Sequence, residues 1–136
     1  MRIELPSISE QQRAIFEQAT QDGIKQLRAN LDAPRLPSQS EVDEQAYSRA
    51  HLLREHEGWE APHPDIICAY FRHFQAHFSD YNTDAKLAAL LGLTSDRRIR
   101  EYKSGARTIP YGVWRKFLVM TGRAPQEIIQ VFAFMG

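Results

Sequence analysis

Apolar residues recur at steps of three and four along much of this chain, which is the spacing of one face of an α-helix. No stretch alternates apolar with polar residues over the length of a strand, so the pattern predicts an all-α protein. Helices are expected over residues 9–31, 41–56, 64–78, 83–91, 95–104, 110–120 and 126–134. The third is the most strongly apolar, with Ile66, Ile67, Tyr70, Phe71, Phe74 and Phe78 at helical spacing.

Breakers divide these helices into two groups. Residues 33–40, APRLPSQS, contain two prolines and two serines and are typical of a linker, and residues 58–64, GWEAPHP, end the second helix. We therefore expect an acidic, helical N-terminal extension over residues 1–62 and a second domain over residues 63–136. Ser7 followed by Glu10 predicts a capping box at the start of the first helix.

Charge divides at almost the same place. Residues 1–65 carry 7 Lys and Arg against 12 Asp and Glu, a balance of −5, and residues 66–136 carry 10 against 5, a balance of +5. The net charge of the whole chain is zero, which hides this asymmetry. An acidic extension on a basic domain predicts two functions or two faces. Chance segregation of ordinary surface charges is the alternative.

The last expected helix is unusual because residues 128–134, IIQVFAF, are apolar on nearly every side. Such a helix is either buried in its own domain or forms half of a dimer seam, and the sequence does not choose between the two. The N-terminal helical pair is the other candidate for self-association.

The stretch from Leu87 to Gly105, LAALLGLTSDRRIREYKSG, has the features that a helix-turn-helix needs. Two helices that cross closely need a small residue at the crossing, which Ala88 supplies. Their turn needs a positive φ, which Gly92 adopts at little cost. Ile99 and Tyr102 lie three residues apart and form the expected buried stripe of the second helix.

This stretch resembles the helix-turn-helix of the lambda-repressor/Cro-like DNA-binding family. The resemblance covers about residues 66–120, under half the chain. Its carriers are Leu87-Ala88, Leu91-Gly92-Leu93-Thr94, Ile99, Tyr102, Ser104-Gly105 and Ile109-Pro110. It implies a five-helix domain in which the helix near residues 95–104 lies in the major groove of double-stranded DNA.

The chain departs from the family pattern at two places. The gap from Gly92 to Ile99 is one residue longer than usual, so either the turn is extended or the recognition helix starts later. Asp84 also stands where the family often has a glutamine that touches phosphate. The first departure leaves the cap of the recognition helix open among Ser95, Asp96 and Arg97.

The chemistry of the side chains predicts two kinds of DNA contact at the expected interface. Arginine reaches guanine O6 and N7 with a bidentate fork, whereas phosphate contacts fix the register. The candidates for base contact are Arg97, Arg98 and Glu101, with Ser104 and Asp96 as secondary ones. The candidates for phosphate contact are Thr83, Lys86, Arg100, Lys103, Arg107, Thr108 and Arg115. A solvated helix face is the alternative for any single arginine.

Other chemistry finds little support. His73 and His77 share a helix face near Cys68, but no HExxH or paired-cysteine spacing accompanies them, so no metal or other cofactor is expected. No nucleophile elbow, P-loop or dinucleotide fingerprint occurs, so an enzyme is not expected either. A single cysteine, the lack of an apolar leader and the lack of a long apolar span predict a soluble, cytoplasmic protein.

The sequence thus predicts a sequence-specific DNA-binding transcriptional regulator. It is expected to be a repressor and a homodimer, because proteins that dock in this way usually bind inverted half-sites. The alternative is a protein-interaction module, antitoxin-like or partner-sequestering, that uses the acidic N-terminal helices.

Overall fold

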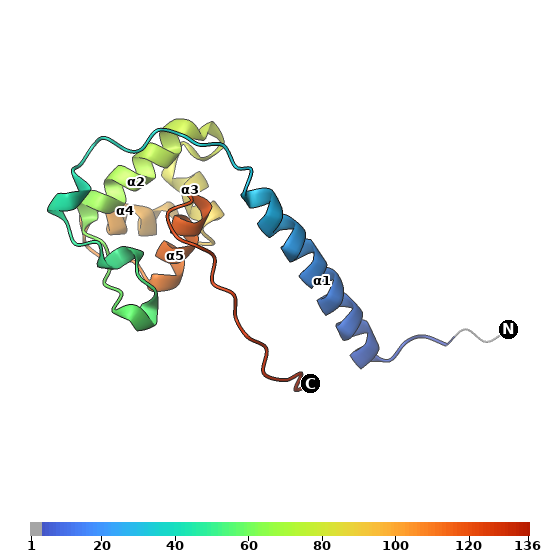
Figure 1. Cartoon of the computed structure of the whole chain (residues 1–136). Helices are drawn as coiled ribbons and strands as arrows, with labels where there is room; N and C mark the ends of the chain where they lie inside the picture. Colours follow the sequence, from blue (N-terminus) through green and yellow to red (C-terminus); the bar gives the residue numbers. More distant parts are fainter. Residues whose placement is uncertain (1–3) are drawn as a thin grey trace. The chain divides into compact units, whose positions relative to one another are not determined.

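In the computed structural model, which describes residues 4–136, the chain forms α-helices and short 3-10 helices, and no strand occurs in these residues. The all-α prediction is confirmed. The α-helices are α1 (Ile8–Asn30), α2 (Pro64–His77), α3 (Asp84–Leu90), α4 (Asp96–Ser104) and α5 (Tyr111–Met120), shown in Figure 1. The 3-10 helices are η1 (Glu44–Ala46), η2 (Ala50–Leu52), η3 (Glu55–Glu57) and η4 (Ser79–Tyr81).

The chain divides into two units. Ser38–Ile128 forms one, and the segment through Pro37 forms the other together with Ile129–Gly136. The division expected between residues 62 and 63 therefore falls inside the larger unit. Residues 1–3, with which the expected extension begins, lie outside the described residues.

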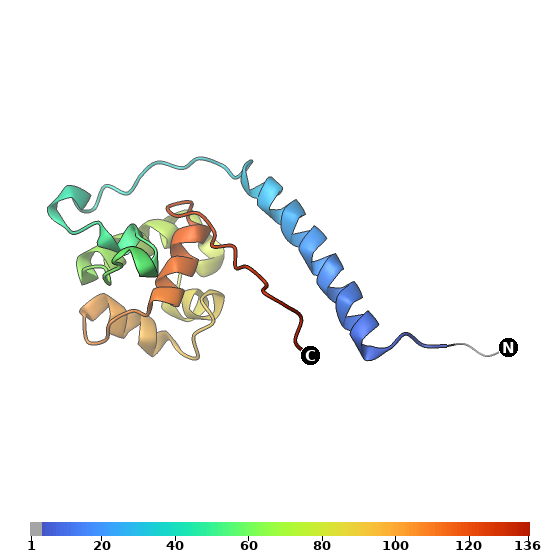
Figure 2. The same cartoon turned by 60° about the horizontal axis from the view of Figure 1, so that its bottom comes forward.

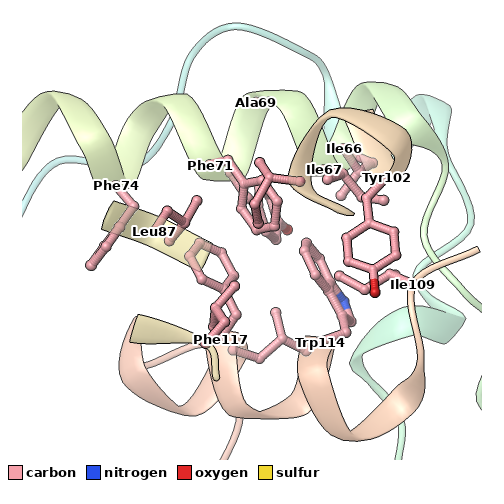
Figure 3. Close-up of a cluster of buried hydrophobic side chains, with 14 of the residues drawn as sticks. Ile66, Ile67, Ala69, Phe71, Phe74, Leu87, Tyr102, Ile109, Trp114 and Phe117 are labelled. Atoms are coloured by element: carbon pink, nitrogen blue, oxygen red, sulfur yellow. The ribbon is translucent and has the colours of Figure 1, made fainter. Parts of the chain in front are cut away.

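The larger unit is built on an aromatic core between α2 and α5. Figure 3 shows Phe71 and Phe74 of α2 meeting Trp114 and Phe117 of α5, with Leu87 of α3 beside them. Phe71, Trp114 and Phe117 are fully buried, and the ring of Phe71 meets that of Phe117 edge to face at 4.9 Å. Because these residues recur every three or four positions, each helix turns one continuous apolar stripe toward the core.

The helix expected over residues 41–56 does not form, and that prediction was wrong. Three separate 3-10 turns, η1 to η3, occupy this part of the chain. Side chains accept from backbone N–H groups along this stretch: Gln39 accepts from Glu41 and Val42, Asp43 from Gln45, and Ser48 from Ala50. Local side-chain bonds of this kind compete with helix formation.

Residues 38–62 instead run along the outside of the core as a strap. Tyr70 donates a hydrogen bond to the carboxylate of Glu44. Burial raises the pKa of Glu44, but the hydrogen bonds from Tyr70 and Gln39 outweigh it, so the pKa is lowered. His51 is buried and accepts a hydrogen bond from the indole N–H of Trp114 at 3.2 Å. Trp59 donates its own indole N–H to the carbonyl of His51. Six of the eleven acidic residues of the expected arm therefore belong to the larger unit.

Helix α1 confirms the first predicted helix and its cap. Ser7 accepts from the backbone N–H of Glu10, and the Glu10 carboxylate accepts from that of Ser7, which is the predicted capping box. No residue of α1 is buried.

The helix expected over residues 126–134 is absent, because the last sixteen residues contain no helix. The side chains of Ile129, Phe132 and Met135 are exposed, so no packing surface stabilises a helix here. β-branched residues, which lower helix propensity, are concentrated at Ile128, Ile129 and Val131. The segment is therefore not a buried helix of its domain, and its part in joining two copies stays a prediction.

Candidate nucleic-acid interface

Helices α3 and α4 form a tight pair joined by the turn around Gly92. Gly92 adopts φ +75°, and the backbone N–H of Leu93 donates to the carbonyl of Ala88 at 2.8 Å, which closes the end of α3. Ala88 is buried where the chain turns back, as the sequence predicts. The two helices lie side by side in both views (Figures 1 and 2). The helix pair, its tight turn and the small residue at the turn are therefore present as the sequence predicts.

The start of α4 resolves the open question of its cap. Ser95 occupies the N-cap position with extended backbone, and the helix begins at Asp96. The residue that the sequence has in excess therefore lies in the turn before α4. The Ser95 side chain makes no capping hydrogen bond, so backbone geometry alone begins this helix.

Two faces of α4 differ sharply in burial. Ile99 and Tyr102 are buried, as predicted, whereas Arg97, Arg100 and Ser104 are exposed. Because α4 also packs against α2, its inner side is held from two directions. The outer side is therefore a rigidly supported, arginine-bearing surface.

The end of α4 is fixed to the start of α2. Gly105 adopts φ +80°, a conformation that side chains disfavour. A β-carbon at Gly105 would lie 3.1 Å from the Cγ of Pro64. Gly105 is therefore required both by its backbone conformation and by this close approach.

Carboxylates on the outer side of α4 hold three of the arginines. Arg97 and Arg107 both reach Glu101, at 2.9 and 2.7 Å, and Arg100 reaches Asp96 at 2.8 Å. The hydrogen bond from Arg107, with the charges of Arg107, Arg97 and Arg98, lowers the pKa of Glu101. Glu101 therefore stays ionised and joins two of the candidate DNA-contacting arginines.

Two further candidates for base contact lie in different surroundings. Arg98 is half-buried and forms no ion pair within residues 4–136. The hydroxyl of Ser104 donates to the carbonyl of Glu101 and accepts from the N–H of Ala106, so it also closes the end of α4.

The candidates for phosphate contact divide into accessible and engaged side chains. Lys86 and Thr108 are exposed. The Thr83 hydroxyl caps α3 by accepting from the N–H of Lys86. Lys103 bonds Asp84 at 2.7 Å. Asp84, the departure from the family pattern, thus joins α3 to α4 through Lys103. The local sequence did not predict this ion pair.

Arg115 is not available to phosphate, and the prediction for this residue was wrong. Its side chain is buried, and its guanidinium donates to the carbonyls of Leu52 at 3.4 Å and Pro125 at 2.8 Å. Its Nε lies 3.7 Å from Glu127. Helical spacing from Trp114 and Leu118 could have placed it at the edge of the buried stripe.

His73 and His77, the two histidines that share a face of α2, lie together in the structure. Among residues 4–136 no group of His, Cys, Asp and Glu is arranged to hold a metal ion. The rings of His73 and His77 meet edge to face with their centroids 4.8 Å apart, so they share a helix face as the sequence predicts. Arg123 lies 3.9 Å above the ring of Tyr70, and burial lowers the pKa of its guanidinium.

No helix in the described residues is both long and apolar enough to cross a membrane. Comparisons with protein-family models, curated proteins and solved structures found no significant match. The resemblance to the lambda-repressor/Cro-like family therefore rests on the sequence pattern between Leu87 and Pro110 alone.

Proposed function

We propose that this protein is a sequence-reading DNA-binding regulator that acts as a dimeric repressor. Helix α4 enters the major groove, which is wide enough for one helix. The observation that supports this most is the pair α3–α4, turned at Gly92, with buried Ile99 and Tyr102 on one side of α4 and exposed arginines on the other.

In this proposal the outward-facing residues of α4 contact the DNA bases. Arg97 and Arg98 present guanidinium forks suited to guanine, and Glu101 can accept from the amino group of cytosine. The bonds from Arg97 and Arg107 to Glu101 are exposed, and exposed ion pairs contribute little stability. They can therefore exchange for contacts with DNA at small cost.

Residues on and around this helix contact the phosphates. Lys86 and Thr108 are exposed, and Arg100 and Arg107 can turn from their carboxylates to the DNA backbone. These contacts position the helix without carrying sequence information. They also make the affinity fall as salt rises, because bound counterions are released.

The test is binding of the full chain to DNA upstream of its own gene and to a random pool of duplexes, at several salt concentrations. We expect tight, salt-dependent binding to a subset of sequences. Arg97→Ala/Arg98→Ala should lose selectivity by at least about tenfold, since each bidentate base contact contributes about 1–3 kcal/mol. The matched control Arg35→Ala/Arg54→Ala removes the same charge at exposed residues outside α1 and α4 and should keep the selectivity.

Absence of salt-dependent DNA binding for the wild-type chain would overturn this proposal. A protein-interaction module is the second candidate, and the exposed apolar residues of α1 favour it. Equal selectivity in the two double variants would instead remove α4 from the role of reading helix.

A further inference from the structure

Helix α1 carries an apolar face that nothing else in the described chain buries. Its large apolar side chains, with that of the C-cap residue, are between 37% and 86% exposed: Ile8, Ile15, Phe16, Ile24, Leu27 and Leu31. They fall mostly on one side of the helix. Most of the stability of helices in proteins comes from packing of an apolar face, so a 23-residue helix that leaves this face open indicates a binding partner.

We propose that α1 pairs antiparallel with the α1 of a second copy of this chain. This proposal rests on the proposed function, because a dimeric repressor needs two copies of the chain. It identifies α1 as the surface that joins them. It concerns α1 alone and requires no particular placement of the larger unit.

The charges of α1 favour a second copy over other partners. The helix has three acidic and three basic residues and is therefore neutral: Glu10, Arg13, Glu17, Asp22, Lys25 and Arg28. An anionic membrane surface or a nucleic acid attracts helices with an excess of Lys and Arg, which α1 lacks. A neutral helix with a broad apolar face is better matched by its own copy.

The order of these charges favours the antiparallel arrangement. Residues 8–19 hold two acids and one base, and residues 20–30 hold one acid and two bases. Glu10 and Arg28 lie eighteen residues apart, which is five turns, so both are on the same side of α1. An antiparallel pair centred near Ala19 sets each Glu10 opposite the Arg28 of the second copy. A parallel pair would set like charges opposite each other.

The C-terminal segment touches this face but does not cover it. The ring of Phe134 meets that of Phe16 edge to face at 5.0 Å. Phe16 remains 43% exposed, and the neighbouring apolar side chains of the helix are exposed as well. The segment thus contributes one aromatic contact and leaves the face open.

Sedimentation of the full chain without DNA, across the micromolar range, tests the pairing. We expect a dimer for wild type and at least a tenfold weaker dimer for Phe16→Glu and for Leu27→Glu. The matched control Gln21→Glu adds the same charge on the polar side of α1 and should stay dimeric. Because α1 buries no residue, these variants should keep the larger unit folded, which tryptophan fluorescence checks.

Cross-linking tests the orientation. In a Cys68→Ser background, cysteine is introduced as Thr20→Cys or as Ser9→Cys, two exposed positions on the same side of α1. Near the centre of an antiparallel pair, two copies of position 20 meet, whereas two copies of position 9 lie roughly 30 Å apart. We expect Thr20→Cys to form a disulfide dimer and Ser9→Cys to remain uncross-linked. Efficient cross-linking at both positions would overturn the antiparallel arrangement.

Two results would overturn the pairing itself. One is a wild-type monomer at every concentration. The other is a dimer that survives Phe16→Glu and Leu27→Glu but is lost with Phe134→Ala, since the C-terminal segment would then form the seam. Neither result bears on salt-dependent DNA binding, which the titrations above measure separately. Failure of the pairing and failure of the DNA-binding proposal are therefore distinguishable.

Discussion

Helix α1 has 23 residues and buries none of them, whereas α4 has nine and buries Ile99 and Tyr102. α1 is held by its capping box and by pairs four residues apart, such as Arg13 with Glu17. α4 is held by packing on α2 and α3 and by the fit of Gly105 against Pro64. The short helix thus depends on its tertiary surroundings, whereas the local interactions of the long one leave its apolar face open, as the proposed pairing requires.

The largest expected effect is a loss of stability from a core substitution in the larger unit, compared with a substitution in the smaller unit. Phe117→Ala should destabilise the larger unit by about 3–5 kcal/mol, because Phe117 is fully buried between α2 and α5. Urea unfolding followed by tryptophan fluorescence measures this loss. Phe132→Ala, in the exposed C-terminal segment, should change the stability by less than about 0.5 kcal/mol. Similar losses in the two variants would contradict the observed core.

Acid should weaken the larger unit through His51. Burial lowers the pKa of His51 to about 4, and the charges of Arg49 and Arg123 act in the same direction against that of Glu44. The unfolded chain takes up this proton near pH 6.5, while the folded chain resists it until about pH 4. Stability present above pH 6.5 is therefore lost as the pH falls toward 4, by about 3 kcal/mol.

The measurement is the urea midpoint between pH 7 and 4 for wild type and for His51→Gln. The variant should be less stable at neutral pH but show a shallower loss over this range. His56→Gln, at an exposed position, should keep the wild-type slope. Equal slopes for wild type and His51→Gln would show that another group causes the loss.

Replacing glycine by alanine should lower stability at Gly105, the C-cap of α4, and raise helix stability at Gly23 of α1. Gly105→Ala should cost about 1–3 kcal/mol, because an alanine is strained at φ +80° and its methyl group would press on Pro64. Gly23→Ala meets no neighbouring atom and should raise the helix content of α1, since alanine is favoured in helices by about 1 kcal/mol. Unfolding and far-ultraviolet circular dichroism measure the two effects. A neutral Gly105→Ala would contradict the close approach.

The smallest effect concerns the charges on α4. Glu101→Gln removes the carboxylate that holds Arg97 and Arg107. Nonspecific DNA binding should tighten by a few fold, and the slope of affinity against salt should steepen by about one contact. Asp43→Asn removes an acidic charge from the strap and should leave both unchanged. A weaker nonspecific affinity in Glu101→Gln would contradict the inferred orientation of α4 toward DNA.

Regular apolar spacing predicted α2 to α5 well, because a stripe such as Ile66, Tyr70 and Phe74 can be buried in only one way. The capping box of α1 and the turn at Gly92 were equally readable, since each depends on residues close in the sequence. The arginines of α4 could be assigned to its outer side once Ile99 and Tyr102 were assigned to the core.

Contacts between distant residues could not be read in this way. The apolar spacing of residues 41–56 resembled that of a helix. The strap over residues 38–62 forms turns instead, because it bonds to distant partners such as Tyr70 and Trp114. Arg115 and Asp84 are charged residues whose partners, Pro125 and Lys103, come from other segments. Local sequence determined where helices begin, turn and bury a stripe. Only the tertiary structure decided which polar side chains face inward, because a charge finds its partners through the fold.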